Sequence, residues 1–180
     1  MAVNLFLDTT SLNPLYYAVF DRIAPAANKY MATLFNGSST NIIMVSRIFR
    51  LNWQFATVTD NDLDQYLARI TARTAGASVT IRSGDTADTV PSGISADTGS
   101  TAVTEDHIIR RVPAINFVWH QDLPLEANAV NGPLVGLIYE RQIEHKGPIL
   151  RNNEGLSIRN ITAVTTGSVS YVFEFSQVYA

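Results

Sequence analysis

Residues 151–179, RNNEGLSIRNITAVTTGSVSYVFEFSQVY, indicate the fold class most clearly. In the last part of this stretch, Val169, Tyr171, Phe173 and Phe175 occupy alternate positions. Because successive side chains of a strand point to opposite faces, these four residues fall on one side of an extended chain. Polar residues, apart from one valine, occupy the positions between them. The pattern predicts a strand that is packed on one face and in contact with water on the other.

The neighbouring segments also read as strands joined by turns. A strand from Gly155 to Ala163 and another from Ser168 to Gln177 are predicted to pair through the Thr-Thr-Gly turn between them. Near the other end of the chain, KYMATLF precedes Asn36-Gly37, the strongest short signal for a hairpin with a type I′ turn. The stretch that follows, NIIMVSRIFRLNWQFATV, is too long for one strand and is predicted to bend near Leu51 or Asn52.

The segment LDQYLARITARTAG is compatible with two structures. Leu63, Leu67 and Ile70 fit one face of a helix. Alternate positions fit one face of a strand instead: Tyr66, Ala68, Ile70 and Ala72. Residues 78–82 alternate as well, and a hairpin through Ala75-Gly76 would join the two segments, so we interpret both as strands.

The next segment, residues 83–104, consists almost entirely of small and turn-forming residues and is predicted as a long loop. The strand pattern resumes with HIIRRVPAINFVWH, in which Pro113 indicates an edge strand or a bend. About eight or nine strands with turn signals between them predict an all-β fold. We expect an antiparallel β-sandwich, most consistent with a jelly roll.

The N-terminal residues stand apart from this pattern. Leu15, Val19 and Ile23 are spaced as on one face of a helix, but an extended arm fits the segment equally well. We therefore divide the chain into an irregular N-terminal arm or short helix, 1–28, and a single β-sandwich domain, 29–180. The first 20 residues have no basic start and contain an aspartate and a proline, unlike a signal peptide.

The composition limits the classes of partner. The 180 residues are 46% hydrophobic but only 16% charged, and the formal net charge is −3. No basic tract is present, so we expect no binding to nucleic acid, and no apolar run is long enough to cross a membrane. Of the 13 basic residues only Lys29 and Lys146 are lysines. This excess of arginine fits residues placed in interfaces, and it fits ordinary compositional drift equally well. The chain has no cysteine, as expected of a protein that folds in a reducing cytoplasm.

Motifs for catalysis or metal binding are not found. The histidines His107, His120 and His145 are not spaced as pairs of metal ligands, and each is expected to be on the surface or partly packed. Asp60, Asp62 and Asp64 resemble the start of an EF-hand loop, but Gln65 and Thr71 stand where that loop needs Gly and Glu. We expect a solvated acidic turn there. We predict no enzyme, no cofactor, no metal site and no catalytic residues.

Two weaker patterns keep other functions open. Paired carboxylates could serve a glycosidase if they flanked a sugar cleft: Glu140 with Glu144, and Asp122 with Glu126. Aromatic side chains could form a sugar-binding face, although core packing explains most of them: Trp53, Trp119, Tyr139 and Tyr171.

Two segments together resemble a known group of proteins. Residues 69–101, RITARTAGASVTIRSGDTADTVPSGISADTGST, and residues 149–175, ILRNNEGLSIRNITAVTTGSVSYVFEF, combine strands, Gly turns and a Ser/Asp/Thr-rich loop. This order resembles virion structural proteins of tailed bacteriophages, including capsid decoration or cement proteins. The resemblance covers about a third of the chain and has no catalytic signature.

The resemblance implies a structural function in the virion. It implies a capsid decoration or cement protein, a homotrimer bound to the major capsid protein, which assembles in the host cytoplasm. Residues 83–104 and the N-terminal arm are the expected contacts, so deletion of residues 1–20 should weaken particle binding and leave the fold intact. The alternative is a carbohydrate-binding jelly roll of a phage tail or receptor-binding protein.

Overall fold

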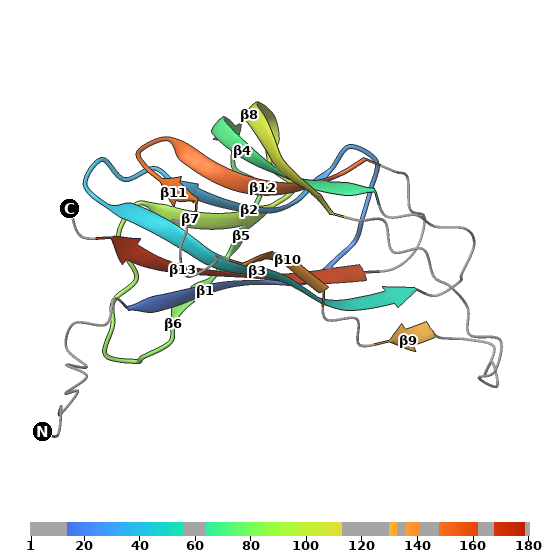
Figure 1. The fold of residues 1–180 in the computed structure, drawn as a ribbon, viewed down its shortest axis with the longest axis horizontal. Helices are drawn as coiled ribbons and strands as arrows, with labels where there is room; N and C mark the ends of the chain where they lie inside the picture. Colours follow the sequence, from blue (N-terminus) through green and yellow to red (C-terminus); the bar gives the residue numbers. More distant parts are fainter. Residues whose placement is uncertain are drawn as a thin grey trace, which may run out of the picture.

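The computed structural model describes residues 14–55, 64–112, 130–132, 136–140, 148–161 and 168–178. In this part of the chain every regular element is a strand. The strands form two antiparallel sheets, one above the other in Figure 1, so the fold is all-β and sandwich-like, as predicted.

Sheet 1 is the lower layer in Figure 1. Its strand order is β10 (Gly136–Glu140), β3 (Ile42–Phe55), β13 (Ser168–Val178), β1 (Leu15–Ile23) and β6 (Ile81–Ser83). Two short strands also pair with β3: β9 (Val130–Gly132) and β11 (Ile149–Leu150). The long strands β3 and β13 lie at the centre and pair along almost their full length.

Sheet 2 is the upper layer. Its strand order is β5 (Ala77–Val79), β7 (Ile94–Thr98), β2 (Tyr30–Asn36), β12 (Glu154–Asn160), β4 (Gln65–Thr74) and β8 (Thr101–Val112). The predicted strand over LDQYLARITARTAG is confirmed as β4. These strand orders do not establish a jelly roll, which stays a prediction.

The core lies between the two sheets. The four alternating residues of the C-terminal strand all point into the core, as predicted, and each is 0% exposed. Two aromatic pairs join β1 to β13: Tyr16 with Phe175, at 5.5 Å between ring centroids, and Phe20 with Phe173, at 5.2 Å. Sheet 2 contributes mainly aliphatic side chains: Met31, Ala32, Leu34, Leu67, Ala96, Leu156 and Ile158.

The opposite face of β13 is drier than predicted. Ser170 is 3% exposed and Ser176 is 8% exposed, so the expectation of a wet face is wrong for these two residues. The Ser170 hydroxyl donates to Asp21 Oδ1 at 2.9 Å and accepts from the backbone N–H of Arg22 at 3.0 Å. Strands β3 and β1 pair with β13 on its two sides, which leaves little room for water at its small side chains.

The predicted hairpins are wrong. In two of the predicted pairs the strands belong to different sheets: β12 and β13, and β2 and β3. In the third pair, β4 and β5 lie in the same sheet but do not pair with each other, because β5 pairs with β7. A turn signal specifies that the chain reverses, but not whether the returning strand joins the same sheet. In a sandwich, a returning strand that joins the other sheet lets the two sheets bury their apolar faces against each other.

The Asn36-Gly37 turn shows the local reason. Neither residue has the positive φ that a type I′ turn requires. The Asn36 amide is fully buried and donates to the backbone carbonyls of Asn41, at 2.7 Å, and Leu150, at 2.9 Å. Its Oδ1 accepts the N–H of Ser38 at 2.9 Å. Asn36 therefore ties together three segments where the chain crosses from sheet 2 to sheet 1.

The N-terminal prediction also needs correction. Leu15–Ile23 is neither a helix nor an arm, because β1 pairs with β13 on one side and β6 on the other. Its alternate residues Tyr16, Ala18 and Phe20 are buried in the core. The sandwich thus begins before residue 29, and the rest of the proposed arm, residues 1–13, lies outside the described residues.

Two further expectations change. Residues 83–104 are not one long loop, because β7 lies within them and pairs with β2 and β5. Small residues hid this strand from a search for hydrophobic alternation. The stretch after Asn41 is a single strand, β3, rather than two. Its register against β13 shifts between Arg50 and Asn52, near the predicted bend.

Candidate functional site

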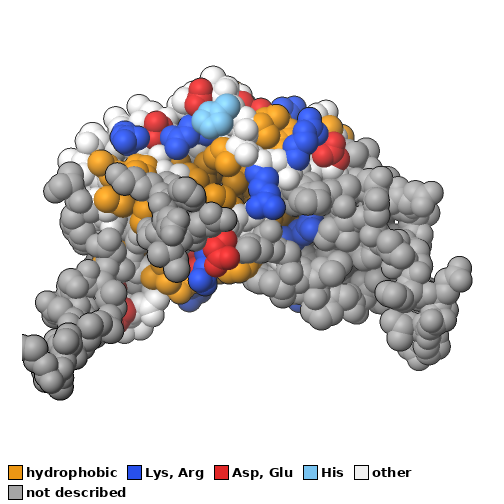
Figure 2. Space-filling model, viewed as in Figure 1, with side chains coloured by type: hydrophobic (Ala, Val, Ile, Leu, Met, Phe, Trp, Pro, Cys, Tyr) orange, Lys and Arg blue, Asp and Glu red, His pale blue; other side chains and the backbone are white. Residues whose placement is uncertain are grey.

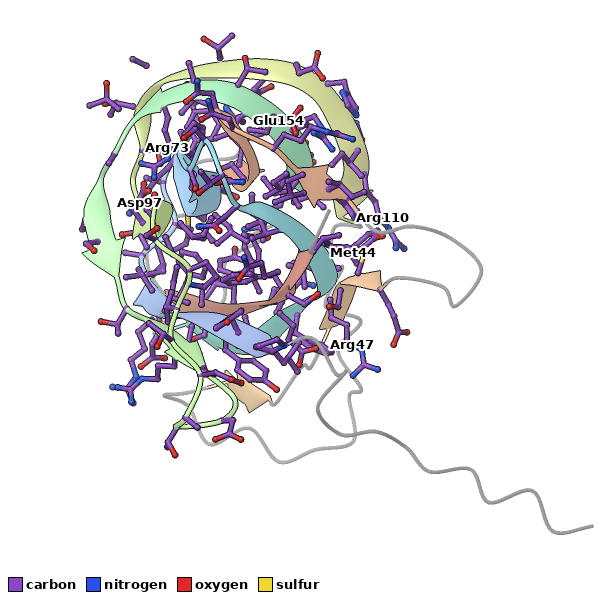
Figure 3. The ribbon with its side chains drawn as sticks, turned by 90° about the vertical axis from the view of Figure 1, so that its left-hand side faces the viewer. Met44, Arg47, Arg73, Asp97, Arg110 and Glu154 are labelled. Carbon is purple, nitrogen blue, oxygen red and sulfur yellow. The ribbon has the colours of Figure 1, made fainter. Side chains whose placement is uncertain are left out.

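A set of polar side chains gathers on the face of sheet 2 that points away from the core. Thr33 lies opposite Ser157 and Asp97 on the neighbouring strands, and Ser157 lies opposite Ala68. Opposed residues share a face of the sheet, yet these four are at most 2% exposed. Figure 3 shows how they are shielded, because β4 and β8 form an arch around β2 and β12.

A buried ion pair lies under this arch. Arg73 Nη1 of β4 is 2.6 Å from Asp97 Oδ2 of β7, and the two side chains are only 4% and 3% exposed. The other guanidinium nitrogen, Nη2, donates to Ser95 Oγ at 2.8 Å. The Arg73 guanidinium also lies 4.9 Å from the centre of the Phe35 ring. The pair thus joins the end of β4 to β7 and β2.

Asp97 has further donors on its other oxygen. Asp97 Oδ1 accepts the backbone N–H of Gly76 at 3.1 Å and the hydroxyl of Ser100. Ser100 Oγ is also 3.0 Å from Thr33 Oγ1, which in turn lies 2.7 Å from Ser157 Oγ. We call these five residues the Asp97 cluster: Thr33, Arg73, Asp97, Ser100 and Ser157.

The corner beside Asp97 requires a glycine. A Cβ at Gly76 would lie 1.9 Å from the carbonyl oxygen of Thr98 and 2.7 Å from the carbonyl carbon of Gly99. Both distances are far shorter than any real contact, and both involve backbone that cannot move aside. Gly76 therefore allows the β4–β5 corner to pack directly on the corner between β7 and β8.

Burial lowers the pKa of the Arg73 guanidinium below its usual value, and the charge and hydrogen bonding of Asp97 act in the opposite direction. Arginine nonetheless stays protonated at any physiological pH. The Asp97 cluster is therefore a paired, hydrogen-bonded charge in a dry place, which is costly to form and more costly to break.

A second network of polar side chains lies on the same face of sheet 2. Glu105 of β8 accepts three kinds of donor: Tyr30 OH at 2.7 Å, Tyr66 OH at 2.8 Å and Arg159 Nη1 at 3.2 Å. Arg159 Nη1 also donates to Tyr66 OH at 2.9 Å, and Arg159 Nη2 donates to Asn28 Oδ1 at 3.2 Å. We call these five residues the Glu105 cluster; they join β8, β4, β12, β2 and the turn before β2.

The Glu105 cluster fixes the protonation of its members. Burial alone would raise the pKa of Glu105, but the hydrogen bonds from Tyr30, Tyr66 and Arg159 outweigh it and lower the pKa. Burial and the hydrogen bond to Glu105 raise the pKa of Tyr30 and of Tyr66 above their usual value. The carboxylate thus stays charged and the phenols stay protonated near neutral pH.

This arrangement suits fixing strands in place rather than proton transfer. A general acid or base works best when its pKa lies near the working pH, whereas each group here is shifted away from it. The donors also occupy both carboxylate oxygens of Glu105. The geometry supports a structural role, because four strands of sheet 2 are held in fixed positions through one carboxylate.

We expect Glu105→Gln to reduce the free energy of unfolding by about 1–3 kcal/mol at pH 7, because a partly buried set of donors loses its charged acceptor. The folded pKa of Glu105 is lowered, so its contribution is present above the unfolded pKa of about 4.3 and is lost as pH falls through the folded pKa. Urea unfolding at several pH values should show that the wild type and E105Q converge in acid.

Glu140→Gln is the matched control for this prediction. Glu140 pairs with Arg47 at 3.1 Å, but both side chains are about half exposed, at 46% and 50%. An exposed pair contributes about 0–1 kcal/mol. If E105Q and E140Q cost the same at pH 7, the Glu105 cluster does not act as a clamp.

Another polar contact crosses the core itself. Gln65 Nε2 of β4 donates to Tyr171 OH of β13 at 2.6 Å, which links sheet 2 to sheet 1. Arg50 of β3, the register partner of Tyr171, is only 3% exposed. Burial lowers the pKa of Arg50 and raises that of Tyr171. The sequence analysis did not single out Arg50, and it named Tyr171 as a strand residue and as a candidate for a sugar-binding face.

The residues singled out from the sequence are scattered over the structure. His107 is exposed, as expected, and its Nδ1 lies 2.8 Å from Asp106 Oδ2. Asp64 lies 3.8 Å from Arg111, as part of a surface ion pair. Tyr139 is half-buried against the core, and Tyr171 is fully buried, so Tyr171 cannot form part of a sugar-binding face.

The remaining candidates cannot be placed. The following lie outside the described residues: Asp60, Asp62, Trp119, His120, Asp122, Glu126, Glu144 and His145. The side chain of Trp53 also lies outside the described part of the structure. The structure therefore does not test the proposed carboxylate pairs.

Sequence reasoning missed both clusters. Their members come from positions as far apart as Asn28 and Arg159, and no short motif joins them. The one available signal was the excess of arginine over lysine, because Arg73 and Arg159 each make several directed contacts that a lysine could not. That signal pointed to interfaces with other molecules rather than to contacts within one sheet.

Within the described ranges, no group of three or more metal-ligating side chains is found. No helix among these residues is long and apolar enough to cross a membrane. Comparison with protein-family models, with curated proteins and with solved structures finds no match to this chain.

Proposed function

We propose that this chain is a virion structural protein of the capsid decoration or cement type, which stabilises a phage shell through protein–protein contacts. The observation that carries the proposal is the Glu105 cluster. It uses five polar side chains to fix the relative positions of four strands, and its protonation states are held away from catalytic use.

A rigid sheet is what such a function requires. A protein that reinforces a shell must bind as a preformed surface, because ordering on binding would reduce its affinity. The buried Asp97 cluster and the Glu105 cluster together hold sheet 2 in one shape. The sequence resemblance to virion proteins of tailed phages agrees with this function, and the partner it implies is the major capsid protein.

The surface also fits repeated contacts with other protein. Figure 2 shows acidic, basic and hydrophobic side chains interspersed over β4 and β8, without a large area of one charge. A mixed surface of this kind is compatible with protein–protein contacts, because an interface as a whole is about as apolar as the rest of a protein surface. We propose a homotrimer in solution and on the particle.

The test is to locate the chain in virions. Particles purified from cells that carry the encoding genome should contain it in stoichiometric amounts, and particles that lack it should release their DNA at a lower temperature. Light scattering on a sizing column should give three times 19.8 kDa for the free protein. Absence from purified particles would overturn the proposal, and binding to a glycan array would then favour the sugar-binding alternative.

A further inference from the structure

The outer edge of β8 is the longest free strand edge in the described structure. β8 pairs with β4 on one side and ends the sheet on the other. It has 12 residues, whereas β5 at the opposite end of sheet 2 has three. Exposed edges attract other strands, and natural proteins usually block them with charge. The charges on this edge therefore indicate which strands it would admit.

The charges of β8 are self-complementary. Residues 105–111 read EDHIIRR, with acids at the start and bases at the end. If a second copy lies antiparallel with its Ile108 opposite the first, Asp106 of each copy faces Arg110 of the other. Glu105 likewise faces Arg111. An unrelated strand would not match this order, so the same charges exclude other partners and admit a second copy.

The exposure of Ile108, at the centre of residues 105–111, fits the same antiparallel arrangement. Ile108 is 46% exposed and is one of two large hydrophobic side chains that are exposed in the described part of the chain. The two-fold axis would bury this side chain against its own copy. Arg110 is exposed, and no ion pair forms with it among the described residues. Figure 3 shows Arg110 at the outer rim of the arch, where a neighbour could reach it.

The other residues of the strand limit the contact to its centre. Glu105 is held by its own cluster, and Arg111 lies 3.8 Å from Asp64, so their mutual attraction contributes less. The pairing of β8 with β4 also shifts register beside His107 and again beside Arg110. Such irregularities increase the twist of a strand and keep the contact short.

We propose that two copies of this chain associate through the β8 edge, antiparallel, with Ile108 on the two-fold axis and Asp106 paired with Arg110 of the second copy. This contact goes beyond the proposed function. On a shell it would join neighbouring subunits through a symmetry that a trimer does not use. It can exist whether or not the chain belongs to a virion.

The absence of cysteine from the sequence makes a direct test possible. Ile108→Cys would place two thiols on the axis, where opposed Cα atoms lie about 4.5–5.5 Å apart, within the range that a disulfide requires. Under mild oxidation, I108C should form a covalent dimer roughly tenfold faster than Val19→Cys, because the contact raises the local thiol concentration. Val19 is the matched control, since it is 44% exposed but lies on β1.

Charge reversal tests the register. In the I108C background, Asp106→Arg or Arg110→Asp should each slow the cross-linking, and D106R/R110D together should restore it, because the reversed pair is again complementary. Sedimentation of the wild-type chain gives a second measurement, in which Ile108→Asp should reduce the pairwise association through β8 several-fold and leave any trimer intact. Equal cross-linking of I108C and V19C would overturn the contact, and a double reversal that restores nothing would overturn the register.

Discussion

A chain that lacks residues 1–20 will not fold, because the deletion removes most of β1. Leu15 to Phe20 would be lost, and with them the fully or almost fully buried side chains of Tyr16, Ala18 and Phe20. Loss of one buried aromatic side chain costs about 3–5 kcal/mol, and the whole stability of a domain is about 5–15 kcal/mol. The deletion also leaves β13 and β6 without a shared partner.

The measurement is thermal unfolding followed by circular dichroism. The matched control is a chain that begins at Pro14, which keeps all of β1. We expect the control to unfold cooperatively near the temperature of the full chain, and the shorter chain to show no cooperative transition. A cooperative transition of the shorter chain within a few degrees of the full chain would show that β1 is not an integral strand of sheet 1.

This pair of deletions also changes how particle binding should be tested. Removing residues 1–20 cannot separate a binding arm from the fold, since it damages both. The chain that begins at Pro14 isolates residues 1–13 instead. Weaker particle binding by that chain, with its stability unchanged, would assign a contact to those residues.

The sequence predicts strands well here and their partners poorly. Val169, Tyr171, Phe173 and Phe175 alternate as they do because one face of β13 lies in the core, and this local pattern is visible without a structure. Which strand lies beside β13 depends on burial over the whole chain. Each predicted hairpin was wrong for that reason. At the Asn36-Gly37 turn, for example, the Asn36 side chain donates a hydrogen bond to the carbonyl of Leu150, which belongs to a distant segment.

The strand β1 shows a second limit. Its positions at Leu15, Val19 and Ile23 fit helical spacing, but Tyr16, Ala18 and Phe20 fit a strand and are the buried set. A segment of nine residues can satisfy both patterns. The aromatic partners Phe173 and Phe175 on β13 decide between them, and these partners lie near the other end of the sequence.

The Asp97 and Glu105 clusters could not be predicted from the sequence for a different reason. Asp97 lies in a run of small residues, SADTGS, which reads as a loop. It becomes a buried ion only because sheet 2 curves and brings Arg73 of another strand over it. Curvature depends on irregular strand pairing, such as the repeated register shifts between β4 and β8, and no local pattern encodes these.

Arg73→Met should be among the most destabilising single substitutions in the chain. It leaves the Asp97 carboxylate buried with only the Gly76 N–H and the Ser100 hydroxyl as partners. Removing one member of a buried ion pair costs about 3–5 kcal/mol. We expect a loss of that size at pH 7 in urea unfolding.

A double-mutant cycle separates the charge from the packing of the arginine stem. Asp97→Asn in the R73M background removes the uncompensated charge while an oxygen remains to accept from Gly76 and Ser100. R73M/D97N should therefore be more stable at pH 7 than R73M alone, a non-additivity that directly interacting residues show. Arg47→Met is the control, since its exposed pair with Glu140 contributes about 0–1 kcal/mol. If R73M costs no more than R47M, the Asp97 cluster does not hold sheet 2 together, and the rigidity on which the proposed function rests must come from elsewhere.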